Sequence, residues 1–322
     1  MYPIFENVVT REGKVWMPEE GKAFDVAYCM GFFSELRKCW PEFKKYTFVV
    51  HLLSPRAPIP EFPIRGQKVI LLLLAEESGL RALDKAFREQ FFAVLRTHLQ
   101  TGWTTKVANL LPFPLGDSLA TEGRTPPSFN ERKWLAGFIG NYNANRLDVY
   151  RSMTPLQHFP PWPFTTPLVK KGYSKLLKTL SSPGTRDFRP QEDVYFTFTS
   201  GFAKGIPLDE YGQLLADTKI AVCPKGFMRA ECYRIFEAMR MGCVVIADEL
   251  PEQRWYSGSP IIIQKNWLKV HDTIRQLHGD PERMLKIHHD MLAWWDEVCS
   301  PRAAARFLAG ELDTLRRRAL DD

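Results

Sequence analysis

The sequence predicts an α/β protein built from two similar halves, and three observations support this. Short apolar runs alternate with amphipathic segments of helical length, which is typical of parallel sheets connected by helices. The 322 residues are 45% hydrophobic, enough for two domains with their own cores. A proline-rich segment at 154–167 interrupts the alternation, which then resumes. Because such sheets bind ligands beyond the carboxyl ends of their strands, we expect a cleft between the halves.

The first half, which we assign to an N-terminal domain over residues 1–160, contains four strand-like runs. The run at 69–75 is continuously apolar and flanked by charge, which indicates a strand buried on both faces. The cluster Gly140-Asn141-Tyr142-Asn143 is typical of a turn at the end of a strand. The predicted strands are 46–53, 69–75, 106–111 and 135–139, and the predicted helices are 80–97 and 145–153.

The second half repeats the pattern, and we assign residues 161–300 to a second domain. Short apolar runs again alternate with amphipathic stretches of helical period. The predicted strands are 194–199, 220–223, 244–247 and 260–263, and the predicted helices are 208–215, 229–241, 281–298 and 301–320.

The net charge and the cysteine pattern limit the kinds of ligand and the compartment that we expect for this protein. The net charge of +6 favours an anionic ligand or an anionic membrane surface, although solubility alone would account for it. Nucleic-acid motifs are missing, and the six cysteines show no CxxC pair or zinc spacing, which fits a reducing compartment. The N-terminus lacks the pattern of a signal peptide. We therefore expect a cytoplasmic protein, with peripheral membrane contact left open.

The segment 223–248 carries the strongest functional signal. A buried strand ends at Cys223, Pro224 stops it, and Lys225-Gly226 forms a loop before a helix that we expect to begin near Met228 or Arg229. Amide groups at a helix start carry partial positive charge and bind phosphate. Lys225 and Arg229 add full positive charges at the same end, so the segment predicts an anion site.

Arg234 and Glu237 lie three residues apart, on one polar stripe of that helix. An arginine can bind a phosphate bidentately, and a carboxylate can accept hydrogen bonds from the vicinal hydroxyls of a ribose. The alternative is that the two form a surface ion pair and that Lys225 and Arg229 are merely solvated. The glycine-rich loops of dehydrogenases and P-loop enzymes are missing from the sequence.

The segment 211–248, with Cys-Pro-Lys-Gly and Tyr-Arg-Ile-Phe-Glu-Ala-Met-Arg-Met-Gly-Cys-Val-Val-Ile, resembles the donor half of exostosin-like glycosyltransferases. The stretch 138–141 with Arg146, and the turn at 112–116, resemble the family's upstream motifs. The resemblance implies the GT-B fold of two Rossmann-like domains. It also implies sugar transfer from a nucleotide diphosphate, usually inverting and without an essential metal. Arg234 and Glu237 would contact the donor's phosphate and ribose, and Arg146 would assist.

The resemblance also guides the remaining assignments. In the GT-B fold the last helix often returns to the first domain, which we expect of residues 301–322. An inverting transferase needs a base for the acceptor hydroxyl, and Glu76 and Glu77 directly follow the strand at 69–75. The alternative is that both are solvated loop charges, and Asp25 and His51 are weaker candidates. No Asp-x-Asp motif is present, so we expect no metal site and no cofactor.

These observations predict a hexosyl- or pentosyltransferase that moves a sugar from a nucleotide-diphosphate donor to a glycan or lipid-linked saccharide. Polysaccharide or glycoconjugate synthesis is the expected setting. Two other readings stay open. One is a sugar-nucleotide epimerase or phosphorylase on the same fold, and the other is a non-catalytic glycan-binding assembly factor.

Overall fold

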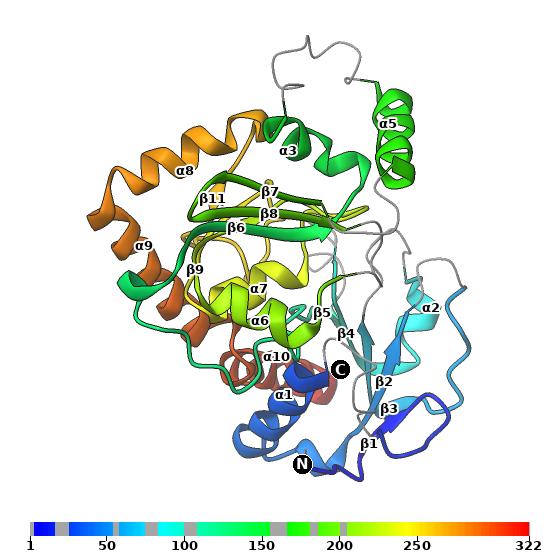
Figure 1. Cartoon of the computed structure of the whole chain (residues 1–322). Coiled ribbons are helices and arrows are strands. Elements are labelled where there is room, and N and C mark those ends of the chain that lie inside the picture. The colour runs from blue at the N-terminus through cyan, green and yellow to red at the C-terminus, as the bar shows by residue number, and fades with distance from the viewer. Residues whose placement is uncertain are drawn as a thin grey trace. The chain divides into compact units, whose positions relative to one another are not determined.

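A computed structural model describes residues 3–16, 26–53, 58–74, 83–99, 108–154, 166–180, 186–199 and 205–321. The chain divides into two compact units, each with its own sheet (Figure 1). Unit 1 contains Met1–Leu119, Pro251–Ser257 and Asp296–Asp322, and unit 2 contains Ala120–Leu250 and Gly258–Trp295. The α/β class predicted from the sequence is confirmed, because strands connected by helices form parallel sheets in both units.

Unit 1 is built on a five-stranded parallel sheet whose strands follow one another in chain order. The central strands β3 and β4 are buried along most of their length, as a continuous apolar run at 69–75 predicts. The strands are β1 (Val8–Thr10), β2 (Thr47–Leu52), β3 (Gly66–Leu74), β4 (Phe91–Arg96) and β5 (Leu110–Pro112).

The long helices of unit 1 come from opposite ends of the chain. α1 (Val26–Cys39) and α10 (Pro301–Asp321) pack against each other. Tyr28 donates a hydrogen bond from its hydroxyl to the carbonyl of Cys299 at 2.6 Å. Trp40 donates from Nε1 to Asp313 Oδ1 at 3.1 Å. The segment that follows Trp295 therefore belongs to the same unit as the N-terminal strands.

Unit 2 contains a six-stranded sheet in the order β11-β10-β9-β6-β8-β7, parallel except for β7 at the edge. The first strand in the chain, β6, lies in the middle, with β8 on one side and β9, β10 and β11 on the other. The strand order therefore reverses between β6 and β9. The strands are β6 (Trp134–Asn141), β7 (Arg186–Gln191), β8 (Val194–Thr199), β9 (Thr218–Cys223), β10 (Val244–Ala247) and β11 (Ile262–Ile263).

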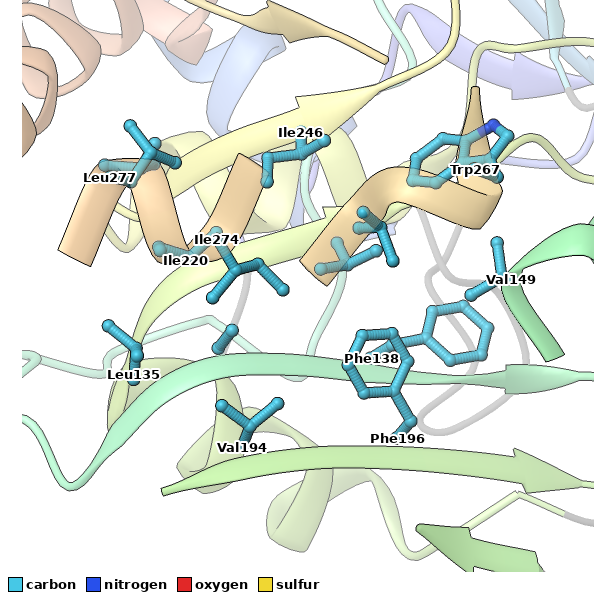
Figure 2. Packing of buried hydrophobic residues seen from close by; sticks show 14 of the residues in the cluster. Leu135, Phe138, Val149, Val194, Phe196, Ile220, Ile246, Trp267, Ile274 and Leu277 are labelled. Atoms are coloured by element: carbon cyan, nitrogen blue, oxygen red, sulfur yellow. The ribbon is translucent and has the colours of Figure 1, made fainter. Parts of the chain in front are cut away.

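Helices cover both faces of this second sheet. α8 packs Ile274 and Leu277 onto alternate residues of the strands, among them Phe196 and Ile246 (Figure 2). The helices α6 and α7 contact β6, β9 and β10 but contribute nothing to this cluster, which places them on the other face. The helices of unit 2 are α3 (Leu147–Ser152), α5 (Pro167–Leu180), α6 (Leu208–Ala216), α7 (Tyr233–Arg240), α8 (Val270–His278) and α9 (Pro281–Trp294).

Two predictions about the first half of the chain are wrong. The segment 80–97 is not one helix, because after the short α2 (Lys85–Arg88) its apolar residues form the buried strand β4. A run buried on every side has no helical or strand period that would distinguish the two. The domain boundary lies at 120 and not at 160, because β6 pairs with β8 and β9 of the second sheet.

Other differences concern the ends and number of elements. Within the described residues, the strand predicted at 106–111 begins at Leu110 and ends at Pro112 as β5, and the strand predicted at 260–263 is shorter, as β11. The sequence patterns did not predict β1, α1, α5, β7 and α8. In the proline-rich segment, residues 155–165 lie outside the described residues. None of the helices in the described ranges has the length and apolar character needed to cross a bilayer.

Candidate functional site

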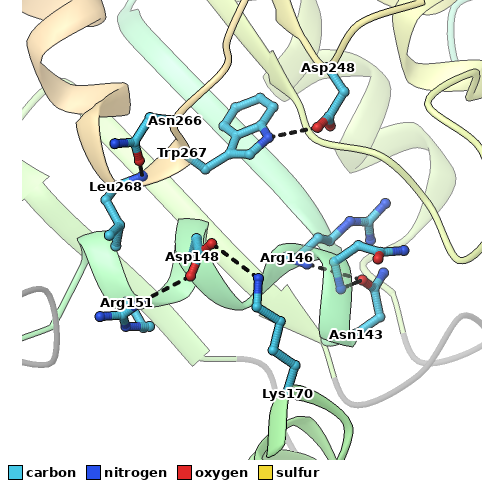
Figure 3. Close-up of polar contacts among 10 residues, drawn as sticks. Asn143, Arg146, Asp148, Arg151, Lys170, Asp248, Asn266, Trp267 and Leu268 are labelled. Carbon is cyan, nitrogen blue, oxygen red and sulfur yellow. Dashed lines mark hydrogen bonds and ion pairs between the residues drawn. The ribbon is translucent and has the colours of Figure 1, made fainter. Parts of the chain in front are cut away.

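The predicted anion site lies where the carboxyl ends of β6 and β9 meet, at the reversal of strand order. In doubly wound sheets, this position is where ligands bind. After β6 the chain turns at Asn143, whose Oδ1 accepts hydrogen bonds from the amides of Asn145 (2.9 Å) and Arg146 (3.1 Å) (Figure 3). This cap starts the short helix η3 (Ala144–Arg146) and holds Arg146 beside the strand end.

Arg146 and Arg234 converge at Gly140. Arg146 donates from Nη1 to the backbone and side-chain oxygens of Asn141, and Arg234 donates from Nη2 to the carbonyl of Ile139 at 2.6 Å. A Cβ atom built at Gly140 would lie 2.8 Å from Arg146 Nη1 and 3.0 Å from Arg234 Nη2. The guanidinium carbons also lie 5.5 and 5.2 Å from the ring centre of Phe138. The two positive groups are therefore close neighbours.

This pair of arginines favours a ligand with more than one negative charge. Two like charges at this separation repel each other, and partial burial weakens the screening by water. Nε and Nη1 of Arg234 are inaccessible to solvent and find no hydrogen-bond partner among the described residues. A diphosphate would offset the repulsion, and a guanidinium group can donate to a phosphate from two neighbouring nitrogens.

Glu237 lies one helical turn beyond Arg234 on α7, and only 4% of its surface is exposed. Its Oε2 accepts a hydrogen bond of 2.6 Å from the hydroxyl of Tyr211 on α6. Burial and the nearby Glu237 raise the pKa of Tyr211 well above its usual value, so Tyr211 stays protonated and remains the donor. The surface ion pair considered above is not what the structure contains, because Glu237 is buried and bonds to Tyr211.

The predicted start of the donor helix is wrong. α7 begins at Tyr233, and residues 224–232 form a loop. The Lys225 amide donates to Asp248 Oδ2 at 2.7 Å, and the Gly226 amide donates to the Arg229 carbonyl at 3.1 Å. The amides of Lys225 and Gly226 therefore stabilise a loop and do not begin a helix. Lys225 and Arg229 carry their positive charges on this loop.

The loop is also fixed to η3. Asn145 donates from Nδ2 to the carbonyls of Gly226 (2.7 Å) and Phe227 (2.9 Å). Arg146 donates from Nε to the carbonyl of Lys225 at 3.2 Å. Asn143, Asn145 and Tyr211 are not among the site residues predicted from the sequence. The turn-forming cluster that ends at Asn143 was a usable signal, since asparagine often caps the turn that follows it.

Asp248, directly after β10, connects the loop to Trp267. Its Oδ2 accepts from the Lys225 amide, and its Oδ1 accepts from Nε1 of Trp267 at 2.9 Å (Figure 3). Both oxygens of this carboxylate therefore hold protein groups in place, and Asp248 orders the edge of the candidate site.

Among the remaining candidates of the sequence analysis, His51 belongs to the described residues. Glu76 and Glu77 lie outside the described residues, as does Asp25. His51, on β2, is half-buried with its ring 5.4 Å from that of Phe62, and burial lowers its pKa. His288 stacks on Phe129 at 4.3 Å and bonds through Nδ1 to the carbonyl of Gly242. Within the described ranges, His, Cys, Asp and Glu side chains form no group of three that could hold a metal.

No family model and no curated protein matches this chain. Among solved structures, the chain is similar to a sucrose-phosphate synthase from Thermosynechococcus elongatus, with a TM-score of 0.48 and 12% identity over 95% of this chain and 81% of that one. It is similar to a glycosyltransferase from Rickettsia africae, with a TM-score of 0.47 and 11% identity over 94% and 85%. It is also similar to a UDP-GlcNAc 2-epimerase from Neisseria meningitidis, with a TM-score of 0.38 and 11% identity over 92% and 83%.

Proposed function

We propose that this chain is a glycosyltransferase that moves a sugar from a nucleoside diphosphate to a glycan or lipid-linked saccharide. The convergence of Arg146 and Arg234 at Gly140, one helical turn from the buried Glu237, supports the proposal. Cations for two phosphates and a carboxylate for vicinal hydroxyls are the groups that a nucleoside diphosphate requires. The motif resemblance to exostosin-like glycosyltransferases is an independent reason to choose this reaction.

Each residue then has a chemical role. Arg146 and Arg234 bind the diphosphate, and Lys225 and Arg229 add positive charge from the loop. As the bond to the anomeric carbon breaks, negative charge grows on the leaving diphosphate, and fixed cations stabilise that charge. Glu237, held by Tyr211, accepts hydrogen bonds from the ribose hydroxyls.

We further propose that Glu76 or Glu77 takes the proton of the acceptor hydroxyl. The acceptor oxygen then attacks the anomeric carbon in one displacement, which inverts the configuration and needs no metal. Both residues follow β3 closely in the sequence, and this supports the role, since parallel sheets bind ligands beyond the carboxyl ends of their strands.

Calorimetric titration with UDP- and GDP-linked sugars tests the donor site. A CMP-linked sugar, which lacks a diphosphate, is the control ligand. Arg234→Ala and Glu237→Gln should each weaken donor binding by about tenfold or more, because each removes a hydrogen bond to a charged group. Arg283→Ala, an exposed position on α9, should bind like wild type. Wild-type affinity in both site variants would exclude the assignment.

The same site would serve an epimerase, which binds the same kind of nucleotide sugar. Product analysis with and without acceptor separates the two reactions. A transferase forms a glycosidic product only when an acceptor is present, whereas an epimerase converts the sugar nucleotide without one. If every sugar nucleotide bound but none reacted under either condition, the non-catalytic reading would be favoured.

A further inference from the structure

One aromatic side chain of the site loop is unusually exposed. Phe227 is 51% exposed, and it is the single aromatic ring among the large hydrophobic side chains that are exposed in the described part of the chain. A single exposed hydrophobic side chain is common on protein surfaces, so the position of Phe227 beside the arginine pair, and not its exposure alone, distinguishes this ring.

The backbone around Phe227 is fixed by several hydrogen bonds. The carbonyls of Gly226 and Phe227 both accept from Asn145, the carbonyl of Lys225 accepts from Arg146, and the amide of Lys225 bonds to Asp248. These bonds fix the loop directly beside the arginine pair. The loop therefore presents Phe227 from a defined place next to the predicted diphosphate.

A chain of contacts connects the groups of the site. Glu237 lies one helical turn beyond Arg234 on α7 and bonds to Tyr211 on α6. Arg234 meets Arg146 at Gly140. Arg146 in turn contacts the loop of Phe227 through the carbonyl of Lys225. If the ribose binds at Glu237 and the diphosphate at the arginines, the group attached to the far phosphate lies toward Phe227.

We propose that Phe227 is the platform for the sugar that is transferred, contacting the apolar face of the ring. This inference rests on the proposed function, because it takes Glu237 as the ribose end of the site. One face of many pyranoses presents several C–H groups, and the face of an aromatic ring carries negative charge that attracts them. Phe227 then selects for the sugar while the arginines bind the diphosphate.

Paired titrations separate the two parts of the ligand. The probes are UDP with UDP-glucose and UDP-N-acetylglucosamine, and GDP with GDP-mannose. Phe227→Ala should lower the affinity for the best nucleotide sugar at least fivefold and change that for its nucleoside diphosphate less than twofold. Phe227→Tyr should keep both affinities near wild type, because the ring remains.

Met228 provides a matched control, since it is the next residue of the loop and is 54% exposed. Met228→Ala should leave both affinities near wild type. An equal loss for diphosphate and sugar nucleotide in Phe227→Ala would place the ring at the nucleoside and overturn the inference, and so would no loss for either ligand. Both results leave the proposed function standing if Arg234→Ala weakens donor binding as expected. If wild type binds none of the probes, the function and this inference fall together.

Discussion

Gly140 shows how one missing side chain makes room for two others. It lies within β6, where its backbone is extended, so a left-handed conformation is not the reason for a glycine here. The space that a Cβ atom would fill is bordered by Phe138 and by the guanidinium groups of Arg146 and Arg234. Because Arg234 reaches this point from a residue distant in sequence, the role of the glycine can be seen only in the folded chain.

Gly140→Ala should weaken nucleotide binding. The new Cβ would lie 2.8 Å from Arg146 Nη1 and from the buried ring of Phe138 and 3.0 Å from Arg234 Nη2, so the ring must shift and the two cations lose their common position. We expect a loss of about tenfold in affinity, near 1.4 kcal/mol, measured by titration with the best nucleoside diphosphate. Gly172→Ala, where a Cβ meets nothing within 4 Å, is the control. Unchanged affinity in Gly140→Ala would argue against joint binding by the two arginines.

Tyr211→Phe tests the partner that holds Glu237. The change removes one hydroxyl and leaves a buried carboxylate without that donor, so we expect unfolding to cost about 1–3 kcal/mol less. Urea titration measures this loss. Nucleotide affinity should also fall severalfold, because Glu237 is no longer held in one orientation. A variant with reduced stability but full affinity would show that Tyr211 serves the fold alone.

At the scale of elements, α7 carries Arg234 and Glu237, and its two ends compare differently with the prediction. Its C-terminus matches the sequence: Gly242 adopts φ +64°, with bonds from its own amide to Met239 and from Cys243 to Ala238. Its N-terminus starts four residues later than the earliest residue of the predicted helix, since bonds from Lys225 and Gly226 hold the preceding segment as a loop.

Gly242→Ala should destabilise unit 2. An alanine is strained at this positive φ, by about 1–2 kcal/mol, and its Cβ would lie 2.7 Å from Cε1 of His288. The midpoint of urea unfolding should fall accordingly. Gly279→Ala, at the end of α8 with φ −73°, is the matched control and should cost much less. Equal losses in both variants would contradict the role of the left-handed turn.

At the scale of the whole molecule, buried histidines connect stability to pH. Burial lowers the pKa of His51 in unit 1 and of His271 and His288 in unit 2 below 6.5. The unfolded chain therefore binds more protons than the folded chain once the pH falls below about 6.5. The stability from neutral histidines is complete above this value and is lost as the pH falls through the lowered pKa values.

Urea unfolding at pH 7.5 and pH 5.5 checks this prediction. The free energy of unfolding should be smaller at pH 5.5, and His288→Gln should reduce the difference between the two pH values. For His288, burial is the largest influence, the bond to Gly242 opposes it, and Arg132 and His289 add to it. A difference that His288→Gln leaves unchanged would assign the pH dependence to other groups.

Local patterns were sufficient for several parts of this protein. The strand at 244–247 has the predicted bounds. Its four consecutive apolar residues lie between a glycine that ends a helix and a charged turn, which is typical of a short buried strand. The spacing of Arg234 and Glu237 needed only the period of a helix. Patterns were insufficient at 80–97, where uniform burial hides the period, and at the domain boundary, which depends on the strands that β6 pairs with.

The sequence by itself therefore determined the α/β class, the end of the donor helix and the presence of cations beside a carboxylate. Tertiary structure alone decided that Arg146 meets Arg234 at Gly140, that Tyr211 holds Glu237 and that both lie at the reversal of strand order. The physical reason is the separation along the chain over which each interaction acts. Helical spacing and glycine turns act between near neighbours in the chain, whereas strand order and side-chain partners are set by which distant segments pack together.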